Sequence, residues 1–418
     1  QGSSLNGLAD DVAKIKQIVG LMPPSHPPSP APPVPPYPPP MQPRLTGLAA
    51  VCGATDGGGG FYELDRVVNV ATFVIGASTY AIVVSRGDDG VQMINVSDPS
   101  APVAIGSATD GVGTANDGGV ATFVIGASTY AIVANMGDGS VQLIDVSDPS
   151  APVAVGGATD GINGFDELAG AFGVATFVIG ASTYAIVASV YDDGVQLIDV
   201  SDPSAPVAAG SATDGINGFD ELDGAYGVAT FVIGASTYAI VASYADSGVQ
   251  LIDVSDPSAP VAAGSATDGI NGFDELAGAF GVATFVIGAS TYAIVASFND
   301  DGVQLIDVSN PSVPVAVGSA TDGINGFDTL DGALGVATFV IGASTYAIVA
   351  SEADDGVQLI DVSDPSAPVA VGSATDGVGG FDELNGAHGL ATFVIGASTY
   401  AIVASDADDG VQLARMLT

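Results

Sequence analysis

The sequence predicts an all-β fold, a closed seven-bladed β-propeller of four-stranded antiparallel blades, and three observations support this prediction. The segment ATFVIGASTYAIV recurs almost unchanged seven times, at spacings of 50 residues once and 54 residues five times. Each copy divides into short apolar runs separated by turn residues, and the first and last units are each incomplete. Repeats of this length form solenoids, propellers or arrays, so the repeat itself defines the class of fold. The copies begin at Ala71, Ala121, Ala175, Ala229, Ala283, Ala337 and Ala391.

Within one unit, four segments have the composition of β-strands. The first two are rich in β-branched and aromatic residues and are joined by the turn Gly180-Ala181-Ser182. The turn Asp192-Asp193-Gly194 is a hairpin signal, and two prolines separate the third strand from the fourth. No segment shows a helical period of 3.6 residues. The predicted strands are Val174–Ile179, Thr183–Val187, Val195–Val200 and Val207–Thr213.

The ends of the array predict how the ring closes. The last unit ends at its third strand, around Val411–Leu413, whereas Leu48–Ala54 matches the fourth strand of the other units. Pairing these two segments completes the last blade and removes two unpaired strand edges. We therefore expect the propeller to span residues 46–418 as one domain.

The segment VQLIDVSDPSAPVAVG resembles the LVIVD-type repeat of surface and extracellular β-propellers, in which an apolar strand is followed by Asp and a DPS-x-P turn. The resemblance extends from about Ala71 to Leu413. It implies a propeller fold and an extracellular, secreted or cell-surface location. Propellers of this type share no catalytic site, so the resemblance transfers no functional residues.

The charge balance restricts the classes of partner. The chain has 47 acidic and 6 basic residues, which gives a formal net charge of −41. Nucleic-acid binding is excluded because it needs a basic surface. Membrane insertion is not expected, since Gly, Ser or Asp interrupts every apolar run. Cys52 is the single cysteine, so no internal disulfide forms; it is either a small buried apolar residue or a link between chains.

Residues 1–22 are predicted to form an amphipathic helix that makes the assembly contact. Their apolar residues follow the 3-4 spacing of a coiled-coil seam, but the helix is too short to be stable alone in water. It therefore folds against other subunits or, alternatively, against its own propeller. The seam consists of Leu5, Leu8, Val12, Ile15, Val19 and Met22.

Residues 23–45 are predicted to be a polyproline II linker. Pro23–Pro43 contains 13 prolines in 21 residues, and at about 3.1 Å per residue such a segment forms a semi-rigid rod. It resembles the proline-rich rods of algal and plant hydroxyproline-rich surface glycoproteins, or else it is a bare spacer or a ligand for an aromatic groove. The resemblance implies hydroxylation and O-glycosylation at Pro24, Pro28, Pro30, Pro32, Pro33, Pro35 and Pro36. Asn95-Val96-Ser97 is a candidate N-glycosylation site.

The loops TDGINGFDEL and the DDG turns are expected to share one face of the propeller and to contain its only candidate metal ligands. Oxygen ligands spaced by glycines suit Ca²⁺, the one candidate cofactor. The alternative is a solvated acidic rim whose Asp side chains cap their own turns. Phe165, Phe219 and Phe273 are expected to anchor the loops. The candidate ligands are Asp160, Asn163, Asp166, Asp214, Asn217, Asp220, Asp268, Asn271 and Asp274.

No arrangement in the sequence predicts catalysis. His388 occupies a position that is Phe, Tyr or Leu in other units, so we interpret it as a packing residue. Two hypotheses for function remain. The first is a non-enzymatic extracellular structural protein, a glycosylated fibril or appendage subunit that self-assembles through its N-terminal helix and proline rod. The second is a cell-surface binding module whose acidic face takes up Ca²⁺, a carbohydrate or a cationic partner.

Overall fold

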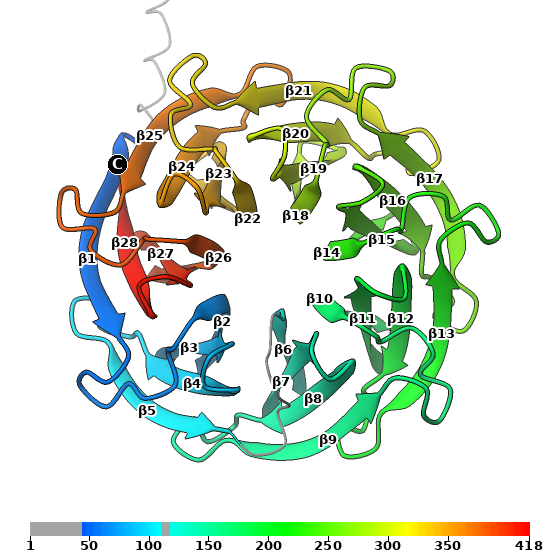
Figure 1. The fold of residues 1–418 in the computed structure, drawn as a ribbon, viewed down its shortest axis with the longest axis horizontal. Coiled ribbons are helices and arrows are strands. Elements are labelled where there is room, and N and C mark those ends of the chain that lie inside the picture. The colour runs from blue at the N-terminus through cyan, green and yellow to red at the C-terminus, as the bar shows by residue number, and fades with distance from the viewer. Residues whose placement is uncertain (1–43, 110–117) are drawn as a thin grey trace, which may run out of the picture. The chain divides into compact units, whose positions relative to one another are not determined.

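The computed structural model describes residues 44–109 and 118–418, and the expected helix and all but the last two residues of the expected linker lie outside this part of the chain. The described residues form 28 strands in seven four-stranded antiparallel sheets, arranged as blades around a central axis (Figure 1). The seven-bladed propeller is thereby confirmed. No helix among the described residues is long and apolar enough to cross a membrane.

Blade 3 shows the arrangement that the other blades follow. It consists of β10 (Ala171–Ile179), β11 (Ser182–Ser189), β12 (Gly194–Asp199) and β13 (Val207–Thr213), hydrogen-bonded in that order. The first strand lies nearest the axis and the fourth forms the outer wall (Figure 1). The fourth strand has the predicted bounds. The first begins three residues earlier than predicted, because pairing resumes at Ala171 beyond an irregularity that precedes Val174.

The remaining strands repeat this order. Blade 1 contains β2 (Val67–Ile75), β3 (Ser78–Ser85), β4 (Gly90–Asn95) and β5 (Val103–Ala108), and blade 2 contains β6 (Val120–Ile125), β7 (Ser128–Asn135), β8 (Ser140–Asp145) and β9 (Val153–Thr159). Blade 4 contains β14 (Ala225–Ile233), β15 (Ser236–Ser243), β16 (Gly248–Asp253) and β17 (Val261–Thr267). Blade 5 contains β18 (Ala279–Ile287), β19 (Ser290–Ser297), β20 (Gly302–Asp307) and β21 (Val315–Thr321). Blade 6 contains β22 (Ala333–Ile341), β23 (Ser344–Ser351), β24 (Gly356–Asp361) and β25 (Val369–Thr375).

Blade 7 is built from both ends of the propeller, as predicted. It contains β26 (Ala387–Ile395), β27 (Ser398–Ser405) and β28 (Gly410–Leu417), and β1 (Gly47–Thr55) adds its outer strand antiparallel to β28. The pairing extends further than predicted, to Leu417. Cys52 is half-buried rather than buried, because it follows a bulge in this outermost strand; its Sγ lies 3.3 Å from the Gly53 carbonyl oxygen.

The core lies between neighbouring blades. Between blades 3 and 4, side chains from β10, β11 and β12 pack against side chains from β15 and β16 and from the loop that precedes β14. The middle strands are therefore covered on both faces, which accounts for their continuous apolar sequences. Near the axis the first strands approach so closely that a Cβ atom on Gly173 would lie 2.1 Å from the Tyr226 carbonyl oxygen. Glycine is required there by the close approach of two backbones.

Candidate functional site

One face of the propeller carries the long loops that precede each first strand and the turns that join each second strand to the third. We call it the loop face. Its repeated loop is a compact hairpin-like turn in which the Gly161 amide donates to the Phe165 carbonyl oxygen at 2.6 Å and Asn163 has a φ of 57°. Phe165, Phe219 and Phe273 are each 4% exposed, so the predicted anchoring of the loops is confirmed.

The predicted calcium ligands do not converge within their loops. Asp160 Oδ1 accepts a hydrogen bond from the Leu168 amide at 3.1 Å, whereas Asn163 and Asp166 are exposed. Asp214 and Asp268 accept the corresponding bonds from Leu222 and Leu276, and Asn217, Asp220, Asn271 and Asp274 are exposed. In residues 44–109 and 118–418, no group of three or more His, Cys, Asp or Glu side chains is placed to hold a metal ion. Calcium binding by these aspartates and asparagines stays a prediction from the sequence.

Carboxylates of the loop face instead bind backbone amides and pair with each other. Asp192 Oδ2 accepts from the Ala169 amide at 2.6 Å, and its side chain contacts that of Asp160. Burial, followed by the negative charge of Asp160, raises the pKa of Asp192, although the Ala169 amide opposes this shift. Asp193 accepts from the Gly224 amide at 3.0 Å and so links blade 3 to the next loop. These acids connect turns to loops.

Three glutamates of the loop face are buried, which the sequence analysis did not predict. Glu167, Glu221 and Glu275 are each 8% exposed. One carboxylate oxygen of each accepts a hydrogen bond from the threonine that ends the outer strand of the same blade: Thr213, Thr267 or Thr321. The other oxygen is buried without a partner among the described residues. Burial is the main cause that raises each pKa to about 7.

Two other blades vary this contact. In blade 7, Glu383 Oε1 accepts from Thr55 Oγ1 at 2.8 Å, which ties the closing strand β1 to the loop before β26. In blade 6 the glutamate is replaced by Thr329, which is buried. The sequence contained a usable signal, because in blades 3, 4 and 5 the SAT motif that ends the outer strand carries the threonine that contacts the glutamate 46 residues earlier. The sequence did not predict that pairing, because the loop acids were interpreted either as calcium ligands or as a solvated rim.

Aromatic side chains from several first strands meet on the propeller axis. The ring of Tyr226 stacks on that of Phe280 with centroids 4.5 Å apart, and Phe172 meets both edge-on. His388 lies edge-on to Phe280 at 5.6 Å, so its prediction as a packing residue is confirmed. Beside them is an axial cavity of about 150 Å³, lined also by the glycines and valines that follow in these strands.

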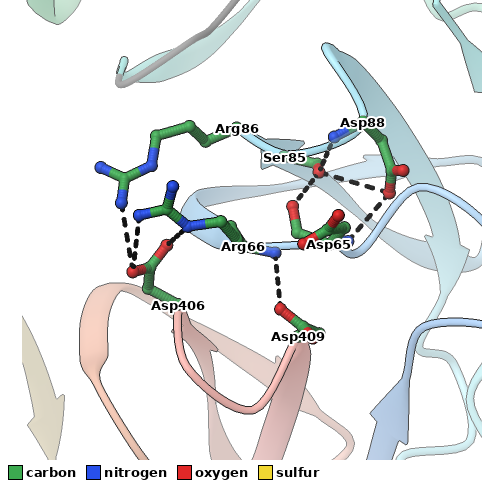
Figure 2. A network of polar contacts seen from close by, with 7 residues as sticks. All are labelled: Asp65, Arg66, Ser85, Arg86, Asp88, Asp406 and Asp409. Carbon is green, nitrogen blue, oxygen red and sulfur yellow. Dashed lines mark hydrogen bonds and ion pairs between the residues drawn. The ribbon is translucent and has the colours of Figure 1, made fainter.

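Two arginines cross the junction between blades 1 and 7 (Figure 2). Arg66 and Arg86 belong to blade 1, and both contact the carboxylate of Asp406 in the turn between β27 and β28. The ion-pair distances are 3.3 Å from Arg66 Nε and 3.2 Å from Arg86 Nη2. The Arg66 amide also donates to Asp409 Oδ1 at 3.0 Å. The arginine side chains thus neutralise part of the acidic loop face where the ring closes.

Asn95, the candidate glycosylation site, ends β4 and is half-buried. Its Oδ1 accepts from the Ser97 amide at 3.0 Å, as Asp199 does from Ser201 in blade 3 at 2.9 Å. Asparagine therefore preserves the turn that aspartate forms in other blades. The candidate hydroxylation sites and the helix seam lie outside the described residues.

A family model for the LVIVD repeat matches residues 124–160, 181–214, 236–268, 289–322 and 343–376. The chain carries LVIVD repeats. Each matched LVIVD segment covers the second, third and fourth strands of one blade and ends at the Asp that opens the next loop. The resemblance drawn from the DPS-x-P turn is thereby confirmed. No curated protein sequence matches the chain.

Solved structures share the fold at low sequence identity. A functionally unknown protein from Desulfotomaculum acetoxidans aligns with a TM-score of 0.51 and 12% identity over 75% of this chain and 90% of its own. Hydrazine synthase from Kuenenia stuttgartiensis aligns with a TM-score of 0.57 and 13% identity over 90% of this chain and 96% of its own. A protein from Lactobacillus plantarum aligns with a TM-score of 0.51 and 15% identity over 79% of this chain and 88% of its own. At these identities the likeness concerns the fold alone.

Proposed function

We propose that this protein is a non-enzymatic extracellular structural protein, a subunit of a glycosylated surface fibril or appendage. In this proposal the propeller is a rigid head, and residues 1–43 make the contact between subunits. The observation that supports it is the closure of the ring by β1 and β28, which completes the propeller within one chain. No strand of a second chain is needed to finish blade 7.

Electrostatics support the same division of roles. The net charge of −41 makes copies of the ring repel one another at low ionic strength. The amphipathic seam of residues 5–22, in contrast, is apolar and too short to fold alone. A head-to-tail contact through this seam that repeats without closing produces a fibre.

The test is to remove residues 1–43 and to compare the assemblies of the two chains. We expect the full chain to form oligomers or filaments, and the truncated chain to stay monomeric by sedimentation and to form no filaments in electron micrographs. Because blade 7 is complete without residues 1–43, the truncated ring should keep its melting temperature. Truncated rings that assemble like the full chain would contradict the proposal.

A second candidate function is a cell-surface binding module, and a specific observation favours it. The repeats are almost identical, yet they differ from one another around the axis on the loop face, as described below. For the same face we retain Ca²⁺ as a candidate ligand of the predicted aspartates and asparagines. Calcium should then give saturable binding and a rise in melting temperature at constant ionic strength. An equal rise with Mg²⁺ or NaCl would reduce the effect to charge screening and exclude the site.

A further inference from the structure

The repeats differ most from one another at two positions of the loop face. One is the axial position near the start of the first strand, and the other follows the second strand directly. The axial residues are Val68, Gly118, Phe172, Tyr226, Phe280, Leu334 and His388. The residues after the second strand are Arg86, Met136, Val190, Tyr244, Phe298, Glu352 and Asp406.

Exposure alone does not explain this variation. On the opposite face, one position of the first strand is valine in all seven blades, although each of these side chains is between 61% and 63% exposed. Solvent-exposed positions have therefore stayed identical elsewhere in the repeat. The variable positions therefore mark the part of the propeller where the blades differ in chemistry, although some of their residues, such as Phe172 and Leu334, are buried. The invariant valines are Val74, Val124, Val178, Val232, Val286, Val340 and Val394.

Blades 4 and 5 contribute the aromatic part of this surface. The rings of Tyr244 and Phe298 are 6.3 Å apart between centroids, and Tyr244 also meets Tyr226 edge-on at 5.8 Å. The Tyr244 hydroxyl donates to Asn299 Oδ1 at 3.2 Å, which fixes the tyrosine across the boundary between the two blades. Two adjacent rings from neighbouring turns are thus held in place and partly exposed.

Blade 6 brings the backbone of Glu352 close to these rings. A Cβ atom on Gly332 would lie 3.4 Å from Cε2 of Phe298, so this ring packs against the loop that leads into blade 6. The Glu352 amide donates to the Gly332 carbonyl oxygen at 3.0 Å. The Glu352 side chain is exposed, and the charges of Asp406 and Arg86 act on its carboxylate with opposite effects. Asp406 in blade 7, in contrast, is paired with two arginines.

We propose that Tyr244, Phe298 and Glu352 form a binding site for an organic ammonium group, such as the side chain of a lysine on a partner. The inference rests on the second candidate function. Aromatic faces attract a cation within about 6 Å of the ring centroid, and a neighbouring carboxylate adds a charge-assisted hydrogen bond. The net charge of −41 raises the local concentration of cations around the whole protein. A carbohydrate would use the ring faces but has no need of the Glu352 charge.

The experiment measures binding of N-acetyl-lysine methylamide to the full chain by NMR titration at constant ionic strength. We expect saturable binding that Glu352→Gln weakens at least severalfold and that Tyr244→Leu weakens by about 2-fold to 30-fold, the range for one cation–π contact. The matched control is Asp202→Asn, which removes one exposed charge from the opposite face and should leave the affinity unchanged. Glu352 is exposed, so the Glu352→Gln variant should fold.

Two results would overturn the inference. Equal weakening by Glu352→Gln and Asp202→Asn would show general attraction to an acidic protein rather than a site. Binding of a neutral oligosaccharide that depends on Tyr244 but not on Glu352, without binding of the lysine derivative, would refute the ammonium ligand and leave the binding function standing. Neither result bears on the truncation experiment, which tests the assembly function separately.

Discussion

At the scale of single residues, the buried glutamates are the most unusual feature of the loop face. A carboxylate oxygen without a donor is costly to ionise in a buried position, and the negative charges of neighbouring aspartates increase this cost. For Glu167 these neighbours are Asp192, Asp160 and Asp166. Burial therefore favours the neutral acid, and the hydrogen bond from the threonine hydroxyl opposes this shift only in part.

This arrangement predicts a loss of stability with rising pH. The pKa of Glu167 is raised from 4.5 to about 7 in the folded state, so between these values the folded chain holds a proton that the unfolded chain has released. Stability must fall across that window and remain lower above it. We expect the variant with Glu167→Gln, Glu221→Gln and Glu275→Gln to lose much of this dependence. The melting temperature of the variant minus that of wild type should be higher at about pH 8 than at about pH 5, by on the order of 2–4 °C.

The control is Asp166→Asn with Asp220→Asn and Asp274→Asn, which removes three exposed acids from the same loops. This variant should retain most of the wild-type dependence on pH, as measured by calorimetry, because burial is the main cause that raises the glutamate pKa values and these three aspartates contribute less. Blade 6 offers an internal comparison, because Thr329 already occupies the glutamate position. A glutamine variant whose melting temperature follows pH as wild type does would show that these glutamates do not carry the effect.

At the scale of elements, the sequence predicted the strands well because each strand has a local signature. The fourth strand has the predicted bounds, Val207–Thr213, since a proline precedes it and an Asp-Gly turn follows it. The first strand begins earlier than predicted, at Ala171, because its pairing continues beyond an irregularity that has no signature in the sequence. Local composition therefore locates strands but does not show where a ladder resumes after a bulge.

The candidate site was less predictable because its contacts join distant segments. The loops were placed on one face correctly, but burial of Glu167 depends on Thr213, which lies in another strand. The ring contact between Tyr244 and Phe298 joins two blades, and the pattern of each blade alone contains no sign of it. Comparing the repeats with each other, position by position, identifies the variable positions from sequence. That these variable positions lie together around one axis becomes visible only in the closed ring.

At the scale of the whole molecule, seven nearly equivalent junctions join the blades, but only one joins segments from the two ends of the propeller. Within blade 7, next to this junction, β1 completes the sheet, and the closing threonine Thr55 contacts Glu383. Arg66 and Arg86 reach Asp406 across the same junction, over 340 and 320 residues of chain. The chain has six basic residues, and two of these six contact the single carboxylate of Asp406 at the closing junction. The two arginines thus add electrostatic contacts beside blade 7, the blade in which β28 and β1 pair although they come from opposite ends of the propeller.

The last prediction follows from this placement. The double variant Arg66→Ala with Arg86→Ala leaves Asp406 near other acids without these arginines, and exposed ion pairs contribute about 0.2–1 kcal/mol each. We therefore expect a lower melting temperature than wild type, with a difference that narrows as NaCl is raised to about 1 M, where the screening length is only about 3 Å. The matched control is Arg415→Ala on β28, an exposed arginine that forms no ion pair with the described residues. Both changes make the net charge more negative. A loss of melting temperature can therefore be attributed to the junction only if it is larger per removed arginine than the loss in the control. A double variant that matches twice the control at every salt concentration would refute the role of the two arginines in closing the ring.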